Sequence, residues 1–223
     1  MQLEKIAAQK AKTHTVYKSA DGTRLPGVTT VLGVLNKPAL VPWSNKLGLQ
    51  GIEVGKYVDA LAQVGTVAHE LVLCHHKGVK FDASPYAPDI VDKAENCLLS
   101  YLEWERGHEV EPVHCEVGFT SPTRHYGGTV DLVAKIDGVL TLADYKSSKA
   151  LYDEHIYQTA AYYQLLIENG VPVEAVRILR IGREETEGFE DKPVTQRQLA
   201  LGAEIFNHCL AIYRKKSEFS KAA

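Results

Sequence analysis

The chain lacks any apolar run near the length of about 18 residues that a membrane-spanning helix needs. Its N-terminus, MQLEKIAAQKAK, also lacks the hydrophobic stretch of a signal peptide. Both absences favour a cytoplasmic protein. Internal repeats, low-complexity segments and linkers rich in proline, glycine and serine are missing as well. We therefore expect a single domain over residues 1–223.

Cysteine is scarce, and its spacing excludes two kinds of site. The four cysteines lie far apart and form no CxxC pair: Cys74, Cys97, Cys115 and Cys209. Neither a zinc knuckle nor a disulfide framework is indicated by such spacing. We expect buried thiols.

An excess of positive charge is missing too. The formal net charge is -3 and the isoelectric point is about 6.3. These values argue against a protein that holds nucleic acid by bulk electrostatics alone, because such domains are usually strongly basic. They do not exclude an enzyme that meets phosphates through bound cations.

The hydrophobic pattern is helical in the first half of the chain and changes to strands after Glu109. A short hairpin turning at Asp21-Gly22 precedes the helices. Alternating Val113, Cys115, Val117 and Phe119 predict the first long strand. We expect helices over about 28–35, 40–49, 57–76, 88–107, 154–170 and 195–216, and further strands over 129–136, 139–146 and 175–182.

The central hairpin carries the most informative pattern. Asp137-Gly138 separates TVDLVAKI from VLTLADYK, which predicts a two-residue type I′ turn between antiparallel strands. Paired positions then have numbers that sum to 275, so that Asp131 lies opposite Asp144. The alternation of side chains places Lys146 on the same face as Asp144, with Thr129 opposite the lysine.

Two opposed carboxylates need compensation, because like charges at such positions destabilise a sheet. Either one carboxyl keeps its proton because its neighbour raises its pKa, or a cation lies between the two. Oxygen ligands at this spacing suit Mg²⁺ or Mn²⁺. A lysine at the end of this face can position a water or neutralise charge on a phosphate. The alternative is an exposed hairpin face whose charges meet only solvent.

These residues resemble the PD-(D/E)XK nuclease superfamily in its RecB-type branch, with the pattern D…(D/E)xK…QxxxY. The matching positions are Asp131, then Asp144-Tyr145-Lys146, then Gln158 and Tyr162. Five motif positions in the right order are far more specific than a lone DxK.

Upstream residues extend the resemblance to roughly residues 26–165. Gly65-Thr-Val-Ala-His69 matches the GxxxH motif of the branch, and Glu116 falls where some members carry an extra acid. The stretch GVTTVLGVLNKPALVPWSNKLG resembles the leading helices of phage-type exonucleases and of the mitochondrial genome-maintenance exonuclease.

The resemblance implies an α/β (α+β) fold with a restriction-endonuclease-like core, in which helices flank a central mixed sheet that contains the antiparallel hairpin. Residues 1–108 would form a mainly helical arch or wall, and residues 109–223 the sheet core with the motifs.

The resemblance also implies roles for the motif residues. One or two Mg²⁺ or Mn²⁺ ions would be held by the ligand set His69, Asp131, Asp144, the backbone carbonyl of Tyr145 and, least securely, Glu116. Lys146 would activate or orient the water, and Gln158 and Tyr162, one helical turn apart, would brace the site or touch the DNA backbone. Gly65 would allow close approach of a strand or substrate beside His69.

The activity implied is that of a metal-dependent DNA exonuclease that leaves 5′-phosphates, in phage or bacterial DNA recombination, repair or degradation. Its substrates would be single strands or duplex ends, with a recombination or single-strand-binding protein as partner, in the host cytoplasm if phage-encoded. One alternative is a CRISPR-adaptation-type nuclease without the iron–sulfur cluster, since Cys209 alone lies in the last quarter. The other is an inactive DNA-binding module of the same fold.

Several of these residues also have an ordinary structural explanation. A histidine such as His69 is more often a core or surface residue than a ligand, and we expect His75 and His76 to be just that. Tyr162 lies among other helical tyrosines and can be a core residue. Trp43 is a candidate for stacking on an unpaired base, although core packing is the commoner role for a tryptophan.

Overall fold

The structure is a computed structural model that describes residues 15–222. The N-terminal segment MQLEKIAAQKAK, in which we expect no signal peptide, lies outside the described residues. The predicted N-terminal hairpin forms, with β1 (Tyr17–Lys18) antiparallel to β2 (Arg24–Leu25). Among the described residues, no helix is both long and apolar enough to cross a membrane.

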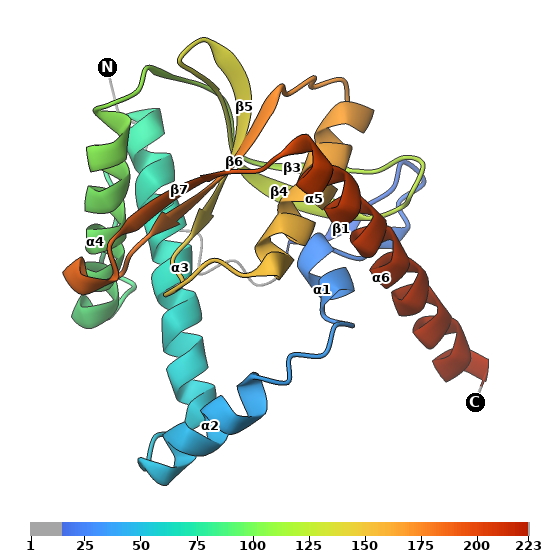
Figure 1. Cartoon of the computed structure of the whole chain (residues 1–223), viewed down its shortest axis with the longest axis horizontal. Coiled ribbons are helices and arrows are strands. Elements are labelled where there is room, and N and C mark those ends of the chain that lie inside the picture. The colour runs from blue at the N-terminus through green and yellow to red at the C-terminus, as the bar shows by residue number, and fades with distance from the viewer. Residues whose placement is uncertain (1–14, 223) are drawn as a thin grey trace.

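A mixed sheet of five strands lies between two layers of helices (Figure 1). Its order is β3-β4-β5-β6-β7, and β5 and β6 form the parallel pair among antiparallel neighbours. The strands are β3 (Val110–Thr120), β4 (Gly127–Ile136), β5 (Val139–Lys146), β6 (Ala175–Ile181) and β7 (Phe189–Pro193). This arrangement confirms the expected restriction-endonuclease-like mixed fold.

The helices fall close to their predicted positions. They are α1 (Val28–Leu32), α2 (Leu40–Leu49), α3 (Val54–Lys77), α4 (Pro88–Glu105), α5 (Asp153–Glu168) and α6 (Gln196–Ala222), with a short 3₁₀ turn at Glu185–Glu187. Helix α1 is shorter than predicted, because two further turns that precede Pro38 do not continue the helical ladder.

Each face of the sheet has its own hydrophobic core. Helices α1, α5 and α6 cover one face, where Tyr126, Leu165 and Phe206 are fully buried. Helices α3 and α4 cover the other, around Tyr101 and Leu132. In Figure 1, α2 and the start of α3 extend away from the sheet, and α2 contains no buried residue. The sheet is therefore closed on both faces, and its strand ends remain available for a site.

The central hairpin has the predicted turn and register. Asp137 and Gly138 have φ angles of 50° and 82°, as a type I′ turn requires. The paired positions run from Ile136–Val139 to Leu132–Ala143 and end there. The predicted pairs Asp131–Asp144 and Thr129–Lys146 lie beyond the last pair, so neither belongs to the ladder. The Thr129 hydroxyl instead lies 2.9 Å from the hydroxyl of Tyr17.

Strand β3 departs from simple alternation. Its register shifts between Pro112 and His114, so that Val113 bulges out and is 49% exposed. Cys115 packs against the core of α3 and α4, whereas Phe119 packs against the opposite core. The predicted strand forms, but it changes face between Cys115 and Phe119. Within that interval Glu116 has a φ of 53°, in the left-handed region.

Strand β7 was not expected from the sequence. FEDKP carries three charged residues and a proline, a composition that is depleted in central strands but common at protected sheet edges. All four cysteines are free thiols. Cys97 and Cys209 are buried as predicted, whereas Cys74 and Cys115 are only partly buried.

Candidate functional site

The two aspartates of the central hairpin lie at the point where the pairing of β4 with β5 ends. Asp131 is 9% exposed and Asp144 is 1% exposed. The alternative of a hairpin face open to solvent is therefore wrong. Burying a carboxylate is costly unless hydrogen bonds or an opposite charge compensate it, so the partners of each acid decide what the site can do.

Asp131 is well compensated. Its Oδ2 accepts a hydrogen bond of 2.8 Å from the backbone N–H of Tyr145, on the neighbouring strand. Its Oδ1 lies 3.3 Å from Nδ1 of His69. Burial alone would raise the pKa of Asp131, but the charge and hydrogen bond of His69 and the charge of Lys146 outweigh it and lower the pKa. Asp131 is therefore the ionised acid of the pair.

His69, on α3, contacts acids of two neighbouring strands, β3 and β4. Its Nδ1 lies 3.3 Å from Oε1 of Glu116 as well as 3.3 Å from Asp131. One ligand atom from each of these three residues falls within 4.8 Å of the others. Burial lowers the pKa of His69, but the two carboxylates raise it to about 10. A cation is thus strongly favoured at the place where these three residues meet.

Asp144 is compensated only in part. Lys146, on the same face, pairs with its Oδ2, whereas its Oδ1 is buried without any hydrogen-bond donor. Burial and the charge of Asp131 raise its pKa to about 6, against the opposing charge of Lys146. A buried carboxylate oxygen without a donor, beside an ionised acid, fits the ligand set of a hard divalent cation.

Helix α5 closes the site from the opposite face of the sheet. Gln158 Nε2 donates a hydrogen bond of 2.8 Å to the hydroxyl oxygen of Tyr162. Tyr162 also belongs to the core on this face, as its ordinary structural explanation expects. Burial, followed by the charges of Asp144 and Asp131, raises its pKa well above the ordinary value. The tyrosine is therefore a neutral hydroxyl facing the acids.

Gly65 lies one turn before His69 on α3, at a point of close approach. A Cβ at this position would lie 3.0 Å from the hydroxyl of Ser147, which follows β5. The glycine allows the helix to approach the end of the strand, as predicted for its motif.

His155 is a site neighbour that the sequence analysis missed. Burial, together with the charges of Lys146, Lys37 and Lys192, lowers its pKa to about 3. It is thus a neutral imidazole held near the motif lysine. The sequence feature that could have indicated His155 is its spacing of three residues from Gln158, which places both on one side of α5.

Trp43 is half-buried and belongs to neither core. Its ring lies 6.2 Å from that of Tyr57, between α2 and α3. The expectation of core packing is wrong for this tryptophan, because α2 lies away from the sheet.

The arrangement of acids, lysine and α5 residues agrees with a comparison of the whole sequence against protein families. The profile of the PD-(D/E)XK nuclease superfamily matches residues 49–221. This chain belongs to that superfamily. The matched segment contains every motif position of this PD-(D/E)XK nuclease, from Gly65 to Tyr162.

Other comparisons add little to this assignment. The crystal structure of LHK-Exo in complex with dAMP is similar, with 14% identity and a TM-score of 0.40, over 73% of this chain and 89% of that chain. The membership of the superfamily does not depend on this similarity. Comparison with curated proteins finds no match.

Nucleases of this superfamily generally use divalent metal ions, and the donors present suit such an ion. Three carboxylates, from Glu116, Asp131 and Asp144, and one imidazole, from His69, lie on adjacent elements. Oxygen-rich sets of this kind favour hard divalent ions.

Proposed function

We propose that this PD-(D/E)XK nuclease is a Mg²⁺- or Mn²⁺-dependent deoxyribonuclease that digests DNA from its ends and leaves 5′-phosphates. The observation that carries the proposal is the state of Asp144. Its carboxylate is buried, has Lys146 of the predicted motif as the partner of Oδ2, and has no hydrogen-bond donor at Oδ1. A core that needed only stability would place an apolar residue here, because an unsatisfied buried carboxylate destabilises the fold.

Asp131 and Asp144 would hold one or two ions, with His69, Glu116 and the backbone carbonyl of Tyr145 as further ligands. When bound, the ion supplies positive charge to the scissile phosphate and lowers the pKa of water. Because the pKa of His69 is raised by the two acids, loading of the site displaces its proton. Metal affinity therefore falls as the solution becomes more acidic.

Lys146 carries out two tasks in this scheme. Its ammonium group, held at Asp144, orients the attacking water and stabilises the negative charge that develops on the phosphate. The water oxygen forms a bond to phosphorus as the bond between phosphorus and the 3′ oxygen breaks. One proton of the attacking water passes to the solvent, and the 3′ oxygen takes up a proton as it leaves, so the new 5′ end keeps the phosphate.

Gln158 and Tyr162 act as a pair. Because the glutamine donates to the tyrosine hydroxyl, the tyrosine proton is free to point toward an acceptor in the site. We assign them to bracing the carboxylates or contacting the DNA backbone.

The first half of the chain would form a wall beside the site within a single domain. Helix α2 and the start of α3 extend away from the sheet, and α2 exposes Leu40, Val41 and Leu49 (Figure 1). Trp43 lies on this part of the protein and is our candidate for stacking on an unpaired base. End digestion is proposed from the resemblance of residues 27–48 to the leading helices of phage-type exonucleases.

The proposed setting is DNA recombination, repair or degradation in a phage or bacterium. The protein would act in the cytoplasm on single strands or duplex ends, with a recombination or single-strand-binding protein as partner.

End-labelled single-stranded and duplex DNA, linear and circular, tests the proposal. With Mg²⁺ or Mn²⁺ we expect mononucleotides or short products carrying 5′-phosphates from linear DNA, intact circles, and no products in EDTA. Nicking of circular DNA would disprove end digestion but not the nuclease. Absence of cleavage of all substrates with either metal would leave only a DNA-binding role.

A further inference from the structure

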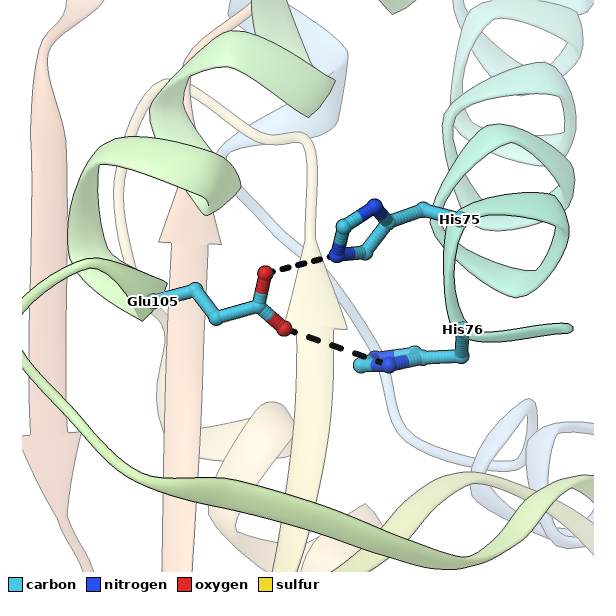
Figure 2. Close-up of side chains that lie close together, drawn as sticks. All are labelled: His75, His76 and Glu105. Carbon is cyan, nitrogen blue, oxygen red and sulfur yellow. Dashed lines mark hydrogen bonds and ion pairs between the residues drawn. The ribbon is translucent and has the colours of Figure 1, made fainter. Parts of the chain in front are cut away.

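A second cluster of metal-binding side chains lies on the far part of α3, away from the catalytic motifs. His75 and His76 in the last turn of α3 face Glu105, the last residue of α4 (Figure 2). One ligand atom from each lies within 4.8 Å of the others. Both histidines were predicted to be ordinary core or surface residues. Glu105 lies 30 positions after His75 and 29 after His76, so the three form no local motif.

The distances suit one ion at the centre of the cluster. His75 Nε2 lies 2.6 Å from Oε2 of Glu105, and His76 Nδ1 lies 3.9 Å from Oε1. Two ligands at about 2.1 Å from a tetrahedral ion are about 3.4 Å apart, which lies between these values. Small rotations of the side chains of His75 and Glu105, which are more exposed than that of His76, would equalise them.

The hydrogen bonds of Tyr101 decide which ring nitrogen of His76 carries the proton. They leave Nδ1, the nitrogen that faces the carboxylate of Glu105, without one. The tyrosine hydroxyl has one hydrogen, which it donates to Oε1 of Glu105 at 3.1 Å. Its 3.0 Å contact with Nε2 of His76 must then be donated by the histidine. In neutral His76 the other nitrogen, Nδ1, is consequently a lone pair directed at Glu105, an arrangement that a cation between the two acceptors would stabilise.

Tyr101 is positioned to orient His76 as a metal ligand, because its hydroxyl contacts the ring nitrogen that does not face Glu105. Ligating histidines usually donate their second ring nitrogen to a fixed acceptor, which sets the tautomer. Tyr101 is fully buried in the core of α3 and α4, so its hydroxyl is held in place. The side chain of His76 is 5% exposed, whereas that of His75 is 37% exposed. The cluster therefore has a rigid inner side and an outer side open to a water ligand.

The ends of two helices also favour positive charge at this place. Both α3 and α4 end here, and the carbonyl groups of a C-terminal turn carry partial negative charge. One carboxylate and two imidazoles make up a ligand set that zinc uses in proteins, whereas Mg²⁺ prefers oxygen alone.

We propose that His75, His76 and Glu105 form a second metal site, selective for a zinc-like divalent transition metal, which ties the end of α3 to the end of α4. The site is distinct from the catalytic centre and does not depend on the proposed nuclease activity. Six residues separate His75 from His69, about 9 Å along the helix. A metal at this place would therefore fix the helix that carries His69.

Zinc binding to the full chain, stripped of metal and titrated against a chromophoric chelator, tests the proposal. We expect Asp131→Asn to keep the zinc that His75→Ala loses, because the two changes affect different sites. His208→Ala replaces an exposed histidine of α6 and is the matched control. Tyr101→Phe removes only the orienting hydroxyl and should weaken zinc binding about 10-fold.

Two further readouts separate a metal site from a hydrogen-bonded cluster. Co²⁺ should give visible absorption bands of tetrahedral strength in the wild type and in His208→Ala, but not in His75→Ala or Glu105→Gln. Zinc should raise the melting temperature of the wild type by more than that of His75→Ala. Equal zinc stoichiometry and affinity in the wild type and His75→Ala, with both folded by circular dichroism, would overturn the proposal and leave a structural hydrogen-bond network.

Discussion

Asp144 is a buried carboxylate in which Lys146 pairs with Oδ2 and no hydrogen-bond donor reaches Oδ1. Such a group lowers the stability of the protein that contains it. The neighbouring Asp131 differs, because a backbone N–H and His69 satisfy it. Two acids in one site with opposite pKa changes are typical of centres that use their charge for chemistry.

The first prediction concerns Asp144→Asn, which removes the charge and keeps the shape. We expect cleavage to be abolished, because a ligand of the ion is lost. The folded-state pKa of about 6 is above the ordinary 3.8. The stability that this group contributes is therefore fully present below about pH 4 and is lost as the pH rises through about 6, at about 1.4 kcal/mol for each pKa unit.

In EDTA at about pH 8 the variant should consequently melt at or above the temperature of the wild type, and the difference should shrink at about pH 4. Differential scanning calorimetry at the two pH values measures the melting temperatures of the variant and the wild type. Asp92→Asn, on the exposed face of α4, is the control. An unfolded Asp144→Asn protein would show that the acid is structural.

The second prediction concerns His69→Ala. The variant should need a Mg²⁺ concentration higher by about 10-fold or more for half-maximal activity, because Glu116 and Asp131 lose the partner between them. Cleavage rates over a Mg²⁺ titration measure the change, with His208→Ala as the control. An unchanged titration would remove His69 from the ligand set.

At the scale of elements, the site depends on how closely α5 and the sheet approach each other. A Cβ at Gly128 of β4 would lie 2.6 Å from the ring of Tyr162 and 3.1 Å from Leu165. Both neighbours are buried and have little room to move. The glycine therefore sets the distance between α5 and the acids of β4.

The third prediction is that Gly128→Ala lowers the free energy of unfolding by about 1–3 kcal/mol through overpacking. It should also reduce activity, because Tyr162 is displaced from its place beside Gln158. Gly48→Ala in α2 is the matched control. No atom lies within 4 Å of its new Cβ, and alanine in a helix is more stable than glycine by about 0.5–1 kcal/mol. Chemical denaturation and single-turnover cleavage compare Gly128→Ala with Gly48→Ala. Equal stability of the two variants would show that α5 shifts without cost to make room for the new methyl group.

At the scale of the whole molecule, the proposed metal binding would be coupled to folding. The proposed ligands come from α3, β3, β4 and β5, which meet only in the folded chain. A ligand that binds only the folded state stabilises it by mass action, by about 2.7 kcal/mol when its free concentration is 100 times its dissociation constant.

The fourth prediction follows from this coupling. Saturating Mg²⁺ should raise the melting temperature of the metal-free wild type by about 5–10 °C, and that of Asp144→Asn much less. Thermal melts over a Mg²⁺ titration measure it. His75→Ala should respond like the wild type, because a site with two imidazoles is a poor one for Mg²⁺. An equal rise in Asp144→Asn would place the ion elsewhere.

The sequence by itself determined the features that depend on neighbours along the chain. Asp137-Gly138 fixed the turn, since both positions take positive φ, and the turn fixed the register of the hairpin. The order of motif residues indicated the superfamily that the profile match then showed. Helix positions followed from the 3.6-residue period of apolar residues.

The tertiary structure alone decided which distant residues meet. Glu116 reaches His69 because β3 changes face at a residue with positive φ, which an alternating pattern does not reveal. His75 and His76 meet Glu105 because α3 and α4 end at the same place (Figure 2). Such contacts depend on packing between elements, whose energy is spread over many side chains and leaves no periodic signal in the sequence.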